Sequence, residues 1–532
     1  MPSPLSPRSL ALALLILSGY VQAQSVLIPV PDRRGHVFDQ SRGLLYIATI
    51  NGCLERFDVE QESFLTPFPV GARLNGLDTT PAEDFVYVAE DLEGATQGLL
   101  YKVNLDSGAV KALAYDKDSG EAGSWDIGIA NNGLGFFTTR ISGSGWTPIR
   151  EIDLATDTLT ARMDVPGSGP GGEVRQDTPI YRGSDRSLLV MAEPNTLSGP
   201  LFTYDAATDS FPTSLSTSVS LSNVFVSVSS DGSLIATEIN GGTVLDPQLQ
   251  TVAALDDLAG GLLFDSIRDR LYGVDPGSDE VVAYDAGSFE ELFRLTIGED
   301  VSFSVPLDDG EMSISADAAR LFLSTNSGVR MFDLGPVLPE VTAVDPMAAE
   351  YDEPPSQVTI SGKHFEHGSG TQVFFGELPA IDVQVIGDQT LTCTTPPLAG
   401  PGLVDVRVVN SSGEGSLEGG FAFKPALILA GDLTPGGKVE LDFLITPGDS
   451  IYAAFGTPPE VAAPIPPFAG ALCISSPSLL FAVGSWFQDS FQIDFDLPPS
   501  ASGLDLLLQA LVSTDLAMGN GAWTNCAVLQ VP

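Results

Sequence analysis

Short apolar runs alternate with polar turns along the first part of the chain. Each unit begins with a turn rich in Asp, Asn, Gly or Ser, followed by an apolar strand such as residues 85–88, Phe-Val-Tyr-Val. After a gap, a second strand ends in an apolar residue and an aspartate. Continuous apolar runs of this length indicate strands that are buried on both faces. Asp and Gly turns let the chain reverse between these strands.

This unit occurs seven times. Its turns begin at Asp39, Pro81, Asn131, Gly183, Ser230, Asp265 and Asp317. Its second strands end at Asp58, Asp106, Asp153, Asp205, Asp246, Asp285 and Asp333, which are 39 to 52 residues apart. A period in this range with short strands is typical of a propeller blade. We therefore predict a seven-bladed β-propeller over residues 24–337, with residues 25–30 forming the outer strand of blade seven.

The recurring turn, followed by Leu or Phe, Tyr or Phe, and Val, resembles the YVTN-type and lactonase-like propellers of exported bacterial proteins. The resemblance implies a fold and leaves the function open, because one fold hosts many functions. Lactonase-type propellers use His, Arg and acidic groups around the axis. His36 is the one histidine in this part of the sequence, so a close copy of that site is not expected.

A second module follows the propeller. Its motifs are residues 339–346, 358–365, 373–376, 391–396, 402–408 and 421–423. The order and spacing of these motifs are similar to those of the IPT/TIG family, whose fold is an immunoglobulin-like sandwich. We place this domain at residues 338–425. The resemblance implies a spacer or a protein-binding domain. Residues 426–532 contain further apolar strands and predict a C-terminal β-sandwich-like domain, so the predicted fold class is all-β throughout.

The first 23 residues have the pattern of a signal peptide. Arg8 precedes the apolar run 10–17, and Val21 and Ala23 place small residues before a cleavage point near Ala23. We therefore expect a secreted protein, located outside the cell or in the periplasm. The apolar run is too short to span a bilayer, and no later stretch has 18 uninterrupted apolar residues, so no membrane insertion is expected.

The chain is strongly acidic, with 69 Asp and Glu, 24 Lys and Arg, and a net charge of −45. Such a surface is repelled by phosphate backbones, so we expect no nucleic-acid partner. The acidity favours solubility, and it also supplies the oxygen ligands that Ca²⁺ prefers. Asp116, Asp118 and Glu121 surround a Gly turn and are candidate ligands for Ca²⁺. The alternative is that these residues form an ordinary acidic turn.

Four cysteines are present. Cys473 and Cys526 lie in the same C-terminal segment, so a disulfide between them is one option in an exported protein. Cys53 and Cys393 lie in different modules, and we expect each to be a small buried hydrophobe.

The sequence has no nucleophile elbow, haem-attachment motif, zinc-protease motif or Walker loop, so no catalytic residue is assigned. Trp146 lies in a Gly-rich loop and is a candidate ligand-binding residue, because an exposed indole offers a flat platform to a sugar ring or a partner. The alternative is that Trp146 folds over its own loop. His364 and His367 are surface residues in one interpretation and a metal pair in another.

These observations favour a secreted, noncatalytic binding or adhesion protein, or an envelope scaffold, whose propeller surface binds an extracellular glycan or protein. The alternative is a hydrolase, lactonase or lyase that holds a divalent metal such as Ca²⁺ on the propeller axis. Polar inner-strand residues that crowd the axis would favour the enzyme. Small or apolar residues there would favour the scaffold.

Overall fold

The computed structural model describes residues 25–92, 96–194, 200–216, 225–255, 258–301, 307, 310–315, 317–351, 353–397, 400–457, 463–465, 468–503, 505–516 and 520–531. The predicted signal peptide lies outside these residues. The described elements are strands and two 3₁₀ helices, which confirms the all-β prediction. The chain divides into two compact units, Met1–Gly335 and Pro336–Pro532, and each is described by itself.

The first unit contains seven antiparallel four-stranded sheets that follow one another along the chain. The first three sheets are β2 (Arg33–Asp39), β3 (Leu44–Thr49), β4 (Cys53–Asp58) and β5 (Ser63–Pro69); β6 (Leu74–Thr79), β7 (Phe85–Glu90), β8 (Gln97–Asn104) and β9 (Val110–Asp116); and β10 (Glu121–Ile129), β11 (Leu134–Ile141), β13 (Arg150–Asp153) and β14 (Thr158–Ala161). The next three are β16 (Ile180–Arg182), β17 (Leu188–Ala192), β18 (Pro200–Asp205) and β19 (Ser210–Ser216); β20 (Val226–Val228), β21 (Ile235–Thr237), β22 (Thr243–Leu245) and β23 (Thr251–Ala254); and β24 (Leu262–Asp265), β25 (Arg270–Asp275), β26 (Glu280–Asp285) and β27 (Glu291–Thr296). The seventh is β28 (Met312–Ile314), β29 (Arg320–Thr325), β30 (Gly328–Asp333) and β1 (Val26–Ile28). The 3₁₀ helices are Pro170–Gly172 and Ile239–Gly241.

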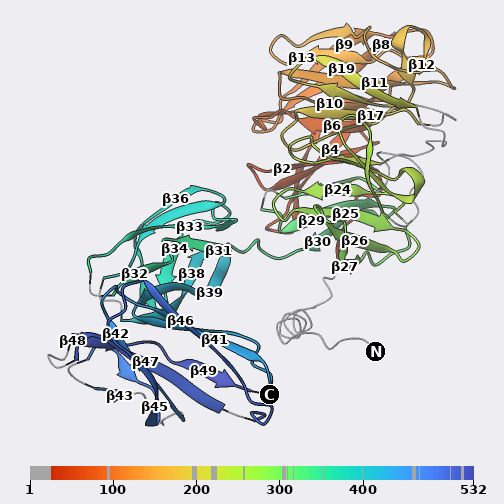
Figure 1. Cartoon of the computed structure of the whole chain (residues 1–532). Coiled ribbons are helices and arrows are strands. Elements are labelled where there is room, and N and C mark those ends of the chain that lie inside the picture. The colour runs from red at the N-terminus through yellow and green to blue at the C-terminus, as the bar shows by residue number, and fades with distance from the viewer. Residues whose placement is uncertain are drawn as a thin grey trace. The chain divides into compact units, whose positions relative to one another are not determined.

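The sheets close into a ring, which we call the seven-sheet ring. The first strand of each sheet contacts the first strand of the next, and β28 of the seventh sheet contacts β2 of the first. In Figure 1 the red first sheet accordingly lies beside the green last sheet. The number of sheets and the order of their strands are those predicted from the seven sequence repeats.

The N-terminal strand completes the seventh sheet, as predicted. Val26, Leu27 and Ile28 of β1 pair with Met331, Arg330 and Val329 of β30. β1 is the outermost strand of this sheet, so two segments from opposite ends of the first unit are hydrogen-bonded to each other. This pairing joins the beginning and the end of the ring.

Apolar side chains fill the space between every two neighbouring sheets. Seven buried clusters are found, and each draws its members from two consecutive sheets, the last from the seventh and the first. In the cluster between sheets one and two, Tyr46, Leu54 and Val86 have no exposed surface. Side chains on both faces of a strand are therefore buried, which explains the continuous apolar runs in the sequence.

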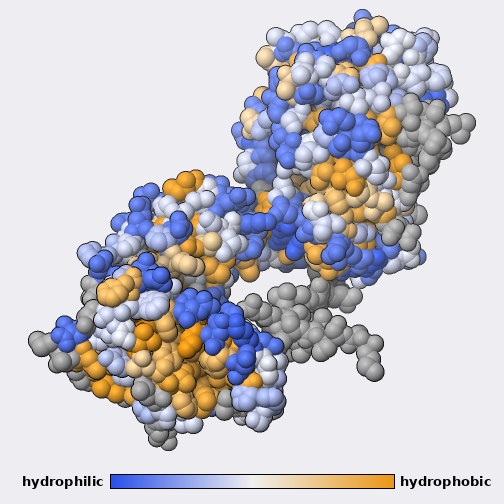
Figure 2. Space-filling view, viewed as in Figure 1, coloured by the Kyte–Doolittle hydropathy of each residue, from blue (hydrophilic) through white to orange (hydrophobic). Residues whose placement is uncertain are grey.

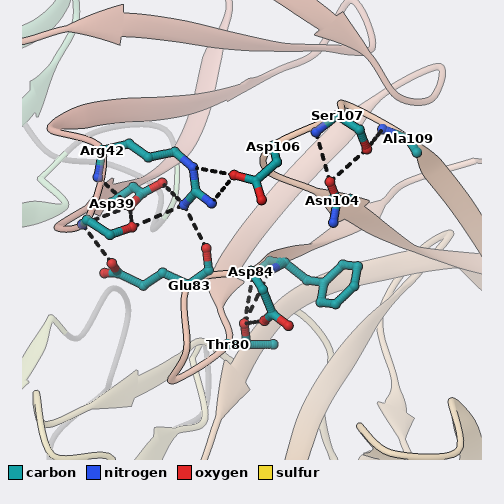
Figure 3. Close-up of polar contacts among 11 residues, drawn as sticks. Asp39, Arg42, Thr80, Glu83, Asp84, Asn104, Asp106, Ser107 and Ala109 are labelled. Carbon is teal, nitrogen blue, oxygen red and sulfur yellow. Dashed lines mark hydrogen bonds and ion pairs between the residues drawn. The ribbon is translucent and has the colours of Figure 1, made fainter.

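Polar side chains join the turns of neighbouring sheets (Figure 3). Arg42, in the turn after β2, donates to Asp39 of its own sheet at 2.9 Å and to the Glu83 carbonyl of the second sheet at 2.8 Å. Its guanidinium also pairs with Asp106 of the second sheet. The Glu83 carboxylate in turn accepts the backbone N–H of Ser41 at 2.8 Å. Asp and Arg residues of the repeat therefore connect adjacent sheets as well as shaping their own turns.

The second unit begins with a sandwich of two sheets. One is β31 (Glu340–Asp345), β33 (Gln357–Lys363), β37 (Thr390–Thr394) and β36 (Ile381–Gly387). The other is β32 (Ala348–Glu350), β39 (Gly413–Lys424), β38 (Gly402–Asn410), β34 (Gln372–Phe375) and β35 (Leu378–Pro379). Val406 and Val408 of β38 are fully buried and Asp405 is exposed, the alternation of a strand with one face in the core.

The C-terminal region forms a second sandwich. Its strands are β40 (Ala426–Gly431), β41 (Lys438–Leu444) and β46 (Ser490–Asp496) in one sheet, and β45 (Ser475–Val483), β42 (Ser450–Thr457), β47 (Asp505–Asp515), β48 (Asn520–Trp523) and β49 (Ala527–Gln530) in the other, with β43 (Ala463–Pro464) and β44 (Ala471–Leu472) as a separate pair. Cys473 and Cys526 form a disulfide, the pairing that the sequence allowed. Cys393 is buried, as expected, whereas Cys53 is partly exposed. Figure 2 shows hydrophobic residues over the visible face of this sandwich.

Candidate functional site

The connections between strands differ strongly between the two faces of the seven-sheet ring. Because the strands of each sheet alternate in direction, the connections from second to third strand and from the fourth strand to the next sheet share one face, which we call the loop face. It includes the longest connections, residues 162–179 and 297–311. The opposite face, which we call the turn face, carries turns of no more than six residues.

Trp146, the predicted ligand-binding residue, lies on the loop face. It begins β12 (Trp146–Thr147), which pairs with β15 (Val174–Arg175) and so joins the connections 142–149 and 162–179. The indole is 43% exposed. The structure therefore places this side chain at the surface, where a ligand can reach it.

The Trp146 side chain is also fixed by its own loops. Its Nε1–H donates to Ser168 Oγ at 2.9 Å, and the guanidinium carbon of Arg175 lies 5.4 Å from the ring centroid. Gly169 approaches so closely that a Cβ there would lie 2.5 Å from the indole Cδ1. Trp146 is therefore exposed and also packs on its own loops, and its role in ligand binding stays a prediction. A side chain fixed in this way has little rotamer freedom left to lose on binding.

Asp116, Asp118 and Glu121 do not form the predicted metal site. The guanidinium of Arg150 donates to the Glu121 carboxylate at 2.7 and 2.9 Å and to the Asp116 carbonyl at 3.1 Å. The Asp118 carboxylate, 65% exposed, lies 3.8 Å from the same guanidinium. The guanidinium of Arg150, on strand β13, therefore lies where we expected Ca²⁺ to bind. Within the described ranges, no group of three or more His, Cys, Asp or Glu side chains could hold a metal ion.

A cavity of about 390 Å³ lies on the axis of the ring. Residues at or beside the first strand of all seven sheets line it. Its volume falls within the range of small-molecule sites, roughly 300–1,000 Å³. Gln40, Ser184 and Ser266 line the cavity, are exposed, and belong to turns after first strands. The cavity therefore opens on the turn face.

Asp78, on β6, is the centre of a buried ion-pair cluster at this cavity. The Nη2 of Arg182 lies 2.8 Å from its Oδ1, and the Nη1 of Arg186 lies 2.9 Å from its Oδ2. Burial by itself would raise the pKa of Asp78, but the two arginines and the hydrogen bond from Ile129 N–H hold the pKa below its ordinary value. One carboxylate thus connects the second, third and fourth sheets.

Among the described residues, a backbone N–H of one sheet donates a hydrogen bond to a side chain at or beside the inner strand of the preceding sheet at four junctions of the ring. Each acceptor takes a backbone N–H of the following sheet at 2.8 to 2.9 Å. The acceptor and donor residues are Asp78 and Ile129, Asp126 and Ile180, Ser227 and Phe264, and Glu311 and His36. The carboxylates on the axis therefore have a structural role.

Asp126 and Glu311 line the cavity with raised pKa values. Burial raises the pKa of Asp126 to about 7, against the effect of the hydrogen bond from Ile180 N–H. Burial likewise raises the pKa of Glu311 to about 8, and the charges of Asp126 and Asp78 add to this shift. Both carboxyl groups can therefore exchange protons near neutral pH.

Polar side chains line the axis, which is the outcome that the sequence analysis associated with an enzyme. Apolar residues also line the cavity, among them Phe225, Val226, Leu262, Leu263 and Met312. Because the axial carboxylates also tie sheets together, their presence is explained without catalysis.

Sequence reasoning did not identify Asp78, Asp126 or Glu311 as axial residues. The inner strands β2, β6 and β10 carry β-bulges, and Asp126 lies inside that of β10, between Ser124 and Ile127. A bulge shifts the inward positions by one residue, so the alternation along the strand no longer reveals which side chains face the axis. For Asp126, the available signal was an isolated carboxylate between the apolar residues Trp125 and Ile127.

His364 and His367 of the second unit each contact another group of the protein. Both are partly buried, and their ring centroids are 5.8 Å apart. His364 Nδ1 lies 3.1 Å from the Leu338 carbonyl oxygen, and His367 Nε2 lies 3.4 Å from Asp388.

Comparison with known proteins identifies one part of the chain. Residues 339–424 match the IPT/TIG domain family, which confirms the predicted second domain. No curated protein matches the chain. A solved structure, Kuenenia stuttgartiensis hydrazine synthase, is similar at 16% identity and a TM-score of 0.44, over 60% of this chain and 100% of that chain. A similarity of this size carries no argument about function.

In the part of the chain that the structure describes, no helix is both long and apolar enough to cross a membrane.

Proposed function

We propose that the chain is a secreted, noncatalytic binding or adhesion protein whose seven-sheet ring is a β-propeller of the YVTN-type, lactonase-like kind. Its loop face binds an extracellular glycan or protein. The IPT/TIG domain and the C-terminal sandwich act as spacers. The signal-peptide pattern of residues 1–23 supports export, and the net charge of −45 argues against nucleic acid as the partner.

The unequal distribution of connections between the two faces carries this proposal. Turns of four to six residues suffice to reverse a strand, and the turn face has such turns throughout. The loop face adds residues 142–149 and 162–179, which pair with each other through β12 and β15. Recognition residues concentrate on loops that a rigid scaffold positions. The loop face is therefore the surface suited to a large extracellular ligand.

Trp146 and Arg175 supply chemistry that suits a glycan on this face. The indole offers an apolar surface to the C–H groups of a sugar ring. The guanidinium beside it donates hydrogen bonds to hydroxyl or carboxylate oxygens. Both residues belong to the paired strands β12 and β15, which fix their separation.

The test is binding of the full exported chain to a glycan array and to an array of extracellular proteins. Trp146→Ala is compared with Phe64→Ala, which removes the aromatic ring of a residue that is 42% exposed, against 43% for Trp146, on the outer strand β5. We expect Trp146→Ala to weaken binding about tenfold or more, as for a central aromatic contact. Phe64→Ala should leave binding unchanged. If the chain binds to neither array, or if the two variants weaken binding equally, the proposal is contradicted.

A hydrolase, lactonase or lyase acting on the axis is the second candidate function. The observation that favours it is the presence of Asp126 and Glu311, with pKa values of about 7 and about 8, in the lining of the axial cavity. Carboxyl groups that titrate near neutral pH suit general acid–base catalysis. Turnover of lactones or glycosides that is lost in Asp126→Asn but kept in Trp146→Ala would favour this function over binding.

A further inference from the structure

One edge of the Arg182 guanidinium is not used by the rest of the ring. Its Nε–H donates to both carboxylate oxygens of Asp78 at 2.9 Å, and its Nη2 lies 2.8 Å from Asp78 Oδ1. Among the described residues, Nη1 of Arg182 has no hydrogen-bond partner. The side chain lines the axial cavity and is 24% exposed. Because a guanidinium has five N–H donors in a planar fork, the edge formed by Nη1 and Nη2 is available to a second acceptor.

The charges around this guanidinium leave one positive charge in excess. Asp78 is a single carboxylate shared by Arg182 and Arg186. Burial would raise the pKa of Asp78, but the two arginines hold it below its ordinary value, so this group is ionised. Burial and the charge of Arg182 lower the pKa of Arg186 to about 10, which leaves that guanidinium protonated at neutral pH. Burial raises the pKa values of Asp126 and Glu311 to about 7 and about 8, so below these values neither carboxyl offsets the excess charge.

The other groups that can carry charge on neighbouring elements are His36, Glu83, Tyr181, Asp265, Arg268 and Arg270. Burial lowers the pKa of His36 to about 3 and raises that of Tyr181 far above its ordinary value, so both are uncharged at neutral pH. Burial raises the pKa of Asp265, and two arginines of its own sheet act against that shift. The Glu83 carboxylate accepts two backbone N–H groups of the first sheet and does not line the cavity. The excess positive charge inside the cavity therefore stays with the two guanidiniums beside Asp78.

The cavity also offers apolar surface. Leu263, Phe264 and Ile314 line it, and each is only partly buried. The volume of about 390 Å³ accommodates a small molecule with a ring-sized hydrocarbon group. The excess guanidinium charge would repel a cation, and an inorganic anion would leave the apolar surface uncovered. A ligand that suits both features carries one negative charge and a hydrocarbon group.

We propose that the axial cavity binds an organic monocarboxylate, whose carboxylate accepts hydrogen bonds from Nη1 and Nη2 of Arg182 and whose hydrocarbon part covers the apolar lining. Bidentate pairs of a guanidinium and a carboxylate are among the stronger hydrogen-bonded contacts in proteins. Arg182 is the last residue of β16 and lies two residues before Ser184 at the exposed mouth, so the ligand enters from the turn face. This site is separate from the loop face, so it goes beyond the proposed function and does not depend on it.

Binding should weaken as pH rises through about 7 to about 8. The ligand itself has an ordinary carboxyl pKa, roughly 4, and is ionised throughout this range. Asp126 and Glu311 lose their protons there, and their negative charges then offset the excess guanidinium charge. A bound anion favours the protonated forms of both groups, so its affinity falls as they ionise.

Isothermal titration calorimetry of the full chain at about pH 6 tests this proposal. The probes are cyclohexanecarboxylate and its neutral isostere cyclohexanecarboxamide, with cyclohexylmethylamine as a cation of similar size. We expect the carboxylate to bind about tenfold more tightly than the carboxamide, as for a hydrogen bond between charged groups, and the amine not to bind. At about pH 9 the advantage of the carboxylate over the carboxamide should be smaller, because Asp126 and Glu311 are then ionised.

Two variants locate the site. Arg182→Gln should abolish the preference for the carboxylate, and Ser266→Trp should block the exposed mouth without removing a charged group. The matched control is Arg294→Gln, which removes an arginine from the outer strand β27 and should leave carboxylate binding unchanged.

The titration uses no loop-face ligand, so failure of this site and failure of the proposed function are distinguishable. Equal binding of carboxylate and carboxamide, no carboxylate binding at about pH 6, or carboxylate binding that survives both Arg182→Gln and Ser266→Trp overturns the proposal.

Discussion

The guanidinium of Arg182, on the inner strand of the fourth sheet, lies 2.8 Å from the carboxylate of Asp78 on the inner strand of the second sheet. The two residues are 104 positions apart in the sequence. Arg186 joins the same carboxylate, and Asp78 also accepts the backbone N–H of Ile129 in the intervening third sheet. Three sheets of the ring therefore depend on one buried charge.

Asp78→Asn should destabilise the ring strongly. The substitution leaves Arg186, whose side chain is 8% exposed, without its charged partner. Breaking a buried ion pair in this way costs about 3–5 kcal/mol. Urea unfolding measures the loss, and Asp118→Asn, at a carboxylate that is 65% exposed, is the control with little expected change. A loss of similar size in both variants would show that Asp78 is not the centre of the cluster.

Ile28 should contribute far more to ring closure than its neighbour Leu27. Ile28 has no exposed surface and packs in the cluster between the seventh and first sheets, whereas Leu27 is 36% exposed on the same strand. Ile28→Ala should cost about 2–5 kcal/mol through the cavity that it leaves. Leu27→Ala should cost about 0.5 kcal/mol or less. Equal thermal shifts for the two variants would contradict closure of the ring by β1.

Asp126 should make the ring less stable as pH rises from about 4 to about 7. The pKa of Asp126 is about 7 in the folded chain, above the ordinary carboxyl value near 4 in the unfolded chain. Its stabilising contribution is therefore complete below about pH 4 and is lost as pH rises to about 7, at about 1.4 kcal/mol per pH unit. Glu311 acts in the same direction up to about pH 8.

The comparison of wild type with Asp126→Asn isolates this effect, because carboxylates with lowered pKa values, such as Asp78, act in the opposite direction. Urea unfolding between about pH 5 and about pH 8 should show a less negative pH slope for the variant. Parallel slopes for the two proteins would mean that Asp126 does not titrate in this range.

Reduction of the disulfide should destabilise the second unit alone. Cys473 and Cys526 are separated by 53 residues, and a closed loop of this length stabilises by about 4 kcal/mol through the unfolded state. The Cys473→Ser, Cys526→Ser double variant should lower the unfolding transition of the second unit in calorimetry. Cys53→Ser, in the first unit, is the control. A shift of the ring transition in the double variant would contradict this assignment.

The sequence predicted the sheets of the ring well, because the physical signal for them is local and repeated. In each sheet, a turn rich in Asp and Gly followed by an apolar run marks the connection between the first and second strands. The strand at residues 26–28 was predicted because the last repeat lacks an outer strand. The IPT/TIG domain was predicted from motifs in register, although β32 within it, which pairs parallel to β39, was not.

The candidate sites were harder to predict because their chemistry depends on contacts between distant residues. The run at Asp116, Asp118 and Glu121 has a ligand-like spacing, but Arg150 from another strand neutralises it. The axial position of Asp126 follows from a bulge and from ring closure, neither of which the local sequence encodes. Trp146 was identified because Gly-rich loops are exposed, a property that the local composition does determine.

The central claim, that the loop face is the binding surface, is tested most directly by hydrogen–deuterium exchange of the full chain with and without a ligand recovered from the arrays. The account predicts protection in residues 142–149 and 162–179 and none in the turns 40–43, 130–133 and 266–269. Protection confined to the turn face, or to residues 336–532, would contradict it.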